Sequence, residues 1–157
     1  MVEKSILKRG GILFFLLAIV FSIPYTTRGF MTFDRMNWYN SLPLSSLTPP
    51  DFVFPIVWTI LYFLMAISAF LVWQKASPRY FVLQLITNGL WPFLFFYLHN
   101  PTAALVDILF MIVFVWLTIK TFYKASKMAA YLLVPLLCWI LFACYLNAYI
   151  VLHLIGK

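Results

Sequence analysis

The amino-acid sequence predicts an all-α fold, an integral membrane bundle of five transmembrane helices. Composition is the first indication, because 65% of the residues are hydrophobic and only 10% are charged, whereas soluble proteins carry about 25% charged residues. The second is a pattern of five apolar runs separated by short polar or proline-containing breaks. The third is that the basic residues stand at the ends of these runs. The spans leave little room for anything else, so we expect one domain, 1–157.

Each apolar run ends at a break that is typical of a helix terminus. The first run follows basic residues and resembles a secretory signal, but no small-x-small cleavage site follows it, so we expect a retained helix. At 1.5 Å per residue each run is long enough for a hydrocarbon core of about 30 Å, the first only marginally. The predicted helices cover about residues 5–25, 52–73, 79–98, 103–122 and 128–155.

Five spans place the two termini on opposite sides of the membrane. The loops on the N-terminal side contain Lys4, Lys8, Arg9, Lys75, Arg79, Lys120, Lys124 and Lys127, and the other side contains Arg28, Arg35 and Lys157. Because Lys and Arg accumulate in cytoplasmic loops, we expect a multi-pass protein of a bacterial plasma membrane with a cytoplasmic N-terminus. The basic residues mark span ends and form no patch in the sequence, so the net charge of +7 does not indicate nucleic acid as a partner.

The connector at about 26–51 and the run that follows it predict a lidded binding pocket. Pro43, Pro49 and Pro50 break regular structure in the connector. Directly after it, Phe54, Trp58 and Tyr62 are spaced by four residues, which places them on one helical face. A proline-rich loop above an aromatic stripe favours an apolar pocket that the loop closes.

Polar residues inside the spans are the next candidates, because such side chains usually turn away from lipid. For Asp107 and Asn147 we favour helix-to-helix hydrogen bonds, and for Asn88, which shares a face with Trp91, a position in the pocket lining. Trp58, Trp91 and Trp139 also lie well inside their spans. An indole N–H needs a partner when it is buried, which a ligand or the protein itself could supply, so ligand contact and plain packing both stay open for the tryptophans.

Templates for metal and enzyme sites do not match this sequence. Cys138 and Cys144 are six residues apart on one predicted helix, so they face different directions and do not bridge. His99 and His153 have no Cys, Asp or Glu at ligand spacing. No P-loop, GxGxxG or serine–histidine–acid pattern is present. We therefore expect no metal and no resident cofactor.

A series of short motifs spread over almost the whole chain resembles one known family. The series is Trp38-Tyr39, Thr48-Pro49-Pro50, Val53-Phe54-Pro55, Trp58, Leu61-Tyr62, Asn88-x-x-Trp91, Ala104-Leu105-Val106-Asp107, Pro135-x-x-x-Trp139, Phe142-Ala143 and Leu146-Asn147. Their order and spacing identify the chain as similar to the bacterial-type members of the translocator protein family, also called TspO/MBR or tryptophan-rich sensory proteins.

The resemblance implies a five-helix bundle, commonly a homodimer, whose first loop folds over a pocket. Members of this family bind porphyrins such as protoporphyrin IX, so the implied partner is a porphyrin or a related apolar ligand, held within the bilayer-embedded bundle. Large flat ligands gain stacking as well as burial against aromatic walls. The implied ligand-binding residues are Trp38, Tyr39, Pro49, Pro50, Phe54, Trp58, Tyr62, Asn88, Trp91 and Trp139.

Two stretches depart from the family pattern. Where the family often has Lys-Pro-x-Trp before the double proline, this chain has Leu44-Ser45-Ser46-Leu47, which removes a cation and an indole from the pocket edge. Arg28 or Arg35 could replace that cation. At the end of the last helix, sterol-binding members place an Arg shortly after a Tyr, whereas Tyr149 here has no nearby Arg. We therefore do not expect tight sterol binding.

Three functional hypotheses follow. The first is a receptor or transporter for porphyrins. The second is an enzyme that degrades porphyrin with light and oxygen, in which Trp58 and Trp139 would be the catalytic positions. The third is an interaction or scaffold protein of the cell envelope.

Overall fold

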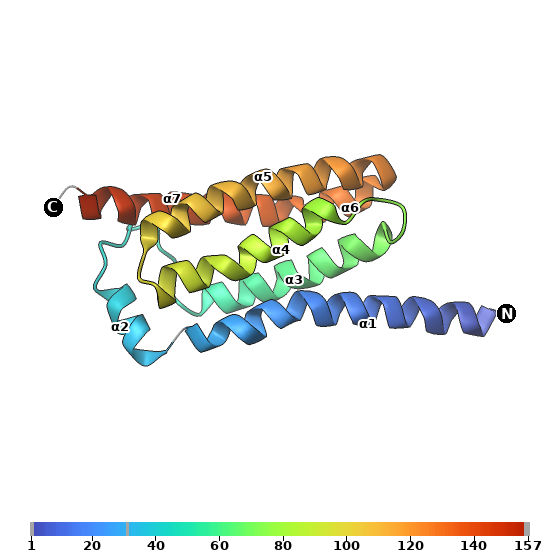
Figure 1. The fold of residues 1–157 in the computed structure, drawn as a ribbon, viewed down its shortest axis with the longest axis horizontal. Helices are drawn as coiled ribbons and strands as arrows, with labels where there is room; N and C mark the ends of the chain where they lie inside the picture. The colour runs from blue at the N-terminus through green and yellow to red at the C-terminus, as the bar shows by residue number, and fades with distance from the viewer. Residues whose placement is uncertain (1, 31, 156–157) are drawn as a thin grey trace.

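The computed structural model describes residues 2–30 and 32–155, and this part of the chain is helical without a strand (Figure 1). Five segments are long and apolar enough to cross a membrane, as predicted. Figure 1 shows their axes running side by side, with the two ends of the chain at opposite ends of the bundle. The elements are α1 (Val2–Thr27), η1 (Arg28–Phe30), α2 (Phe33–Asn40), α3 (Val53–Leu71), α4 (Arg79–Pro92), η2 (Phe93–Tyr97), α5 (Pro101–Ala125), α6 (Lys127–Tyr131) and α7 (Val134–Ile155).

The bundle is a ring of helices with one loose seam. Helix α1 packs against α3 and α4, helix α5 packs against α4, α6 and α7, and α6 closes the ring against α3. Helices α3 and α7 make less contact with each other than either makes with its other neighbours. The seam between α3 and α7 is therefore where the bundle can leave space.

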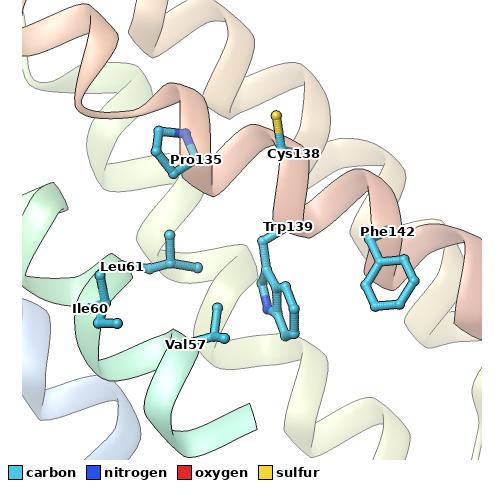
Figure 2. A pocket seen from close by; sticks show the side chains of 7 residues that line it. All are labelled: Val57, Ile60, Leu61, Pro135, Cys138, Trp139 and Phe142. Atoms are coloured by element: carbon cyan, nitrogen blue, oxygen red, sulfur yellow. The ribbon is translucent and has the colours of Figure 1, made fainter. Parts of the chain in front are cut away.

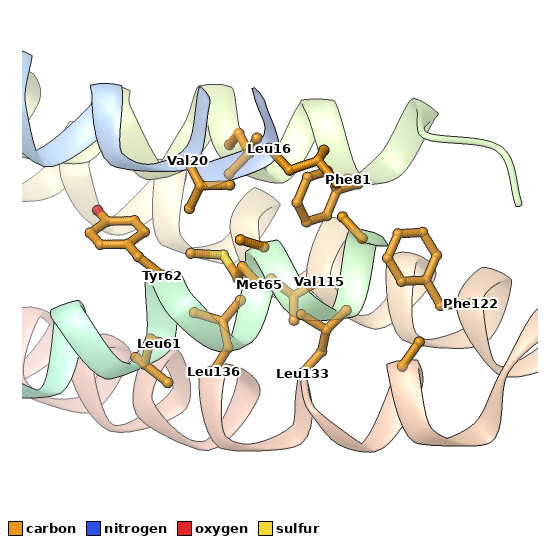
Figure 3. Close-up of a cluster of buried hydrophobic side chains, with 14 of the residues drawn as sticks. Leu16, Val20, Leu61, Tyr62, Met65, Phe81, Val115, Phe122, Leu133 and Leu136 are labelled. Atoms are coloured by element: carbon orange, nitrogen blue, oxygen red, sulfur yellow. The ribbon is translucent and has the colours of Figure 1, made fainter. Parts of the chain in front are cut away.

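Apolar side chains of several sizes fill the centre of the ring. Figure 3 shows this cluster, in which Val20 of α1, Met65 of α3, Val115 of α5 and Leu136 of α7 are at most 1% exposed. Large apolar side chains also cover the outside of the helices, for example Phe110, which is 56% exposed. Apolar residues on both the inner and the outer faces are what a bundle immersed in lipid requires.

The third predicted span is not one uniform helix. Pro92 lacks a backbone N–H and its ring disfavours the regular α-helical ladder, and the next five residues form a π-helical turn, η2. The Leu98 N–H donates to the Phe93 carbonyl at 3.0 Å, and His99 then takes a positive φ of 49° that reverses the chain. The Asn100 side chain accepts from the Ala103 N–H at 3.0 Å and so begins α5.

The fifth predicted span is also divided. Ser126 separates α5 from α6, and its hydroxyl accepts from the Ala129 N–H at 3.3 Å. A turn at Leu132 and Leu133 then separates α6 from α7, because Pro135 cannot donate the backbone hydrogen bond that would continue one helix. These breaks leave α6 as a short helix of its own against α3.

The connector at 26–51, predicted as a turn-rich loop, contains a helix that the sequence analysis missed. Helix α2 has no Pro or Gly, and Asp34 in its first turn suits the positive end of the helix dipole. Its decisive support is tertiary, because Tyr39 packs on Phe95 and Phe96 of η2 with ring centroids 6.1 and 5.8 Å apart. Helix α2 thus forms only together with the turn that follows α4.

One hydroxyl fixes α6 to α3, and its removal is a test of this packing. Ser68 is fully buried and its hydroxyl donates to the Ala129 carbonyl at 2.7 Å. We expect Ser68→Ala to lower the free energy of unfolding by about 0.5–1.5 kcal/mol, measured by denaturing titration in mixed micelles. The matched control is Thr59→Ala, whose hydroxyl bonds only within α3 and is exposed. Equal effects of the two substitutions would contradict the assigned role of Ser68.

Candidate functional site

An apolar cavity of about 400 Å³ lies at the seam between α3 and α7 (Figure 2). Its wall is made of Val57, Ile60, Leu61, Pro135, Cys138, Trp139 and Phe142. Ile60 is 55% exposed and Cys138 is also exposed, so the cavity opens on the outer surface of the bundle. In Figure 2 the indole of Trp139 stands between the two helices and forms the largest flat part of the wall.

The cavity is a product of helical periodicity on two facing helices. On α7, Pro135, Cys138, Trp139 and Phe142 follow the i, i+3, i+4, i+7 spacing of one helix face. The three residues from α3 show the same spacing over one turn. Of the seven wall residues, Trp139 alone was predicted as a ligand-binding residue, although the spacing of the others is present in the sequence.

Phe54 meets Trp139 beside this cavity. The two ring centroids are 5.8 Å apart, with planes at 68°, which is a favourable edge-to-face arrangement. Phe54 lies in the first turn of α3 and does not line the cavity itself. It fixes the indole in position and closes the seam on the side of the connector.

Tyr62 and Asn88 form a hydrogen-bonded pair inside the ring. The Tyr62 hydroxyl donates to Asn88 Oδ1 at 2.8 Å, and Asn88 Nδ2 lies 3.9 Å from the Met111 sulfur. Trp58 stacks on Tyr62 with ring centroids 5.5 Å apart. Trp58, Tyr62 and Asn88, all predicted to bind ligand, therefore pack against or hydrogen-bond one another. Their contacts bring α3, α4 and α5 together.

Trp91 and Asn147 form a second buried polar connection. The Trp91 indole N–H donates to Asn147 Oδ1 at 3.1 Å, and Asn147 Nδ2 donates to the Pro101 carbonyl at 2.8 Å. Asn147 is only 2% exposed. This amide consequently joins α7 to α4 and to the first turn of α5, and the indole N–H has a partner within the protein.

Asp107 differs from these pairs, because one of its oxygens has no partner. The side chain is 5% exposed, and Oδ2 accepts no hydrogen bond from the residues that the structure describes. Gln84 Oε1 is in the same situation. A buried acceptor without a donor costs free energy, and the helix-to-helix hydrogen bond of Asp107 stays a prediction.

The connector is anchored over the η2 end of the bundle. Trp38 lies against Phe95 at 5.6 Å and against the His99 ring at 4.3 Å between ring centroids, and Phe95 stacks on Trp91 at 4.9 Å. Burial, with a smaller contribution from the Asp51 carboxylate, raises the pKa of the Tyr39 hydroxyl above its ordinary value.

The stretch at 44–47, which departs from the family pattern, is attached to α7. Ser45 is buried, and its hydroxyl lies 3.1 Å from the Tyr145 hydroxyl of α7. Pro49 and Pro50 follow, and the Pro50 carbonyl accepts from the Val53 N–H at 2.9 Å where α3 begins. The Arg35 guanidinium is held by the Gly29 carbonyl at 3.1 Å and lies 4.7 Å from the Tyr97 ring centroid.

The ten predicted ligand-binding residues thus occupy three places. Among the described residues, Trp139 is the one member that lines the cavity. A second set packs inside the ring or beside the cavity, and a third belongs to the connector. The interior set is Phe54, Trp58, Tyr62, Asn88 and Trp91, and the connector set is Trp38, Tyr39, Pro49 and Pro50.

The polar connection through Asn147 can be tested by a double-mutant cycle. We expect Asn147→Leu to cost about 1–3 kcal/mol of unfolding free energy, because the part-buried Trp91 N–H loses its acceptor. Combined with Trp91→Phe, it should cost less than the sum of the two single changes. Asp107→Leu is the contrast, since it removes an unpaired oxygen and should leave stability equal or higher. Additive effects in the cycle would contradict the Trp91–Asn147 bond.

Comparisons with known proteins show which family this chain belongs to. The sequence pattern of the TspO/MBR family matches residues 13–152. The chain is 42% identical over 118 residues to the tryptophan-rich protein TspO of Chlorobaculum tepidum, covering 70% of this chain and 75% of that protein. It is 40% identical over 134 residues to the tryptophan-rich protein TspO of Archaeoglobus fulgidus, covering 82% and 87%. Over 123 residues it is 32% identical to the human translocator protein, covering 73% of each chain. This chain therefore belongs to the TspO/MBR family of integral membrane proteins.

Proposed function

We propose that the protein is a membrane receptor or transporter that binds porphyrins of the protoporphyrin IX class, and that the cavity between α3 and α7 is where the macrocycle docks. The observation that carries the proposal is the wall of this cavity, which is apolar and includes the indole of Trp139. Its volume of about 400 Å³ falls within the range of ligand sites. A flat aromatic ring system gains both burial and stacking against such a wall.

The proposal also states what kind of affinity to expect. The seven wall residues carry no charge, and the Arg35 guanidinium is already engaged by Gly29 and Tyr97. Burial and stacking, rather than an ion pair to a propionate, would then supply the binding free energy. The dimethyl ester of protoporphyrin should consequently bind about as well as the free acid.

Filling the cavity is the direct test. We expect Ile60→Trp to weaken porphyrin binding at least about tenfold, because the larger side chain occupies space that the macrocycle needs. The measurement is a titration of the purified protein with porphyrin in the dark, in which the absorption of the porphyrin reports binding. Trp116→Phe is the matched control, since this exposed residue lies on α5 away from the cavity. Unchanged binding by Ile60→Trp would place the porphyrin elsewhere.

A second function, porphyrin breakdown driven by light and oxygen, is supported by the position of Trp139 in the cavity wall. A macrocycle in the cavity would touch Trp139, whereas Trp58 lies against Tyr62 away from the wall. Illuminating the bound complex in air distinguishes the two functions. A receptor leaves the porphyrin spectrum intact, whereas an enzyme forms a new product at a rate that falls in Trp139→Phe while binding persists.

We also infer a topology from the basic residues, with the N-terminus in the cytoplasm of a bacterial cell and the connector outside. Homodimer formation stays a prediction from the family. Ser46 is exposed in the connector, so Ser46→Cys in a background where Cys138 and Cys144 are replaced by Ala should react with a membrane-impermeant maleimide in intact cells. Protection of this thiol until the cells are broken would reverse the assignment.

A further inference from the structure

Three lysines gather at the corner where α5 ends and α6 begins. Lys120 and Lys124 lie in the last turns of α5, and Lys127 begins α6. All three are exposed. Ser126, in an extended conformation with φ −160°, turns the chain between the two helices. These three lysines, which mark the ends of two spans in the sequence, therefore lie at one corner of the folded protein.

Aromatic rings border two of these lysines. Lys120 Nζ lies 5.3 Å from the Trp116 ring centroid, and Lys127 Nζ lies 5.9 Å from the Tyr123 ring centroid. Tyr123 in turn packs edge-on against Tyr131 of α6, with ring centroids 6.2 Å apart. Contact with a ring face limits the freedom of each ammonium group. The corner is therefore a partly ordered arrangement of charges.

No acidic side chain that the structure describes neutralises this corner. Asp34 lies in α2 and Asp51 lies just before α3, both at the opposite end of the bundle, and Asp107 is buried near the beginning of α5. The lysines thus present a local excess of positive charge. An anionic partner is the complement of such a surface.

The surroundings of this corner indicate which kind of anion would bind there. It lies at the ends of two membrane spans, Pro101–Ala125 and Lys127–Ile155, and it carries exposed Met128 and Tyr131 beside the lysines. Exposed Trp and Tyr rings are typical of the depth at which lipid head groups begin. A free anion in water would gain nothing from the apolar side chains, whereas a lipid contacts both the charges and the apolar surface.

We propose that the α5–α6 corner is a binding site for the phosphate head group of an anionic phospholipid, held by Lys120, Lys124 and Lys127 and bordered by Tyr123 and Tyr131. The acyl chains would lie along the outer face of α5. This site is separate from the cavity, since none of its residues belongs to the cavity wall. It is therefore independent of the porphyrin proposal.

A matched pair of triple variants tests the site against general electrostatic attraction. The first is Lys120→Gln with Lys124→Gln and Lys127→Gln. The control is Arg9→Gln with Lys75→Gln and Arg79→Gln, which removes the same charge from the same end of the bundle. Figure 1 shows the beginning of α1 and the link between α3 and α4 at the same end of the bundle as the α5–α6 corner. Phe81, near Arg79, also stacks on Phe122 of α5, with ring centroids 5.8 Å apart.

The readout is the lipid that stays bound after extraction from vesicles of equal parts phosphatidylcholine and phosphatidylglycerol, identified by native mass spectrometry. We expect the wild-type protein to be enriched in phosphatidylglycerol. The first triple variant should lose this enrichment by about fivefold per lysine, and the control should keep it. Replacing the same three lysines by arginine should also preserve the enrichment, which separates charge loss from misfolding.

Several results would overturn the proposal. Equal losses in the two triple variants would mean that the basic end attracts anions without a site, and no enrichment in the wild-type protein would remove the site altogether. A further arm adds inorganic phosphate at the concentration of the lipid head groups. Displacement of phosphatidylglycerol by this phosphate would identify a soluble anion, not a lipid, as the occupant.

Discussion

The buried polar connections of α4 hold this bundle in one arrangement. Within a bilayer, apolar helix faces gain little by leaving lipid for one another, so packing and hydrogen bonds between helices decide how they associate. Asn88 on α4 accepts from Tyr62 of α3, and Trp91 one turn later donates to Asn147 of α7. Asn147 adds the Pro101 carbonyl of α5. A single helix is thereby positioned against three others, and the apolar core fills the space that these bonds define.

The same connections explain why the predicted pocket lining is divided in the structure. The family resemblance implied that Tyr62, Asn88, Trp91 and Trp139 line one pocket together. The first three instead satisfy their polar atoms with each other or with Asn147 and leave Trp139 to face open space. An indole or amide that already has a partner has less to offer a ligand. The cavity therefore has the apolar character of its seam rather than the polar character of the ring interior.

How much the sequence could predict depended on the range of the interaction. The five spans follow from local hydropathy, and each lies where the apolar runs indicated. Helix α2 could not be predicted, because its stability comes from Tyr39 packing on Phe95 and Phe96, far along the chain. The cavity could not be predicted from either helix alone, because it depends on how little α3 and α7 contact each other in the folded bundle. The break at Pro92, by contrast, has a local cause in the missing backbone N–H of proline, so it could have been predicted from the sequence.

The position of the cavity mouth determines whether a ligand would arrive from water or from lipid. The mouth lies between two helices that are each long enough to cross a bilayer, and the surrounding outer surface is apolar. A hydrophobic molecule that reaches it from the side is already dissolved in lipid, where partitioning has concentrated it. Occupancy would then follow the amount of ligand per lipid rather than per volume of water. Two membranes in contact with the same aqueous solution could in this way load the protein to different extents.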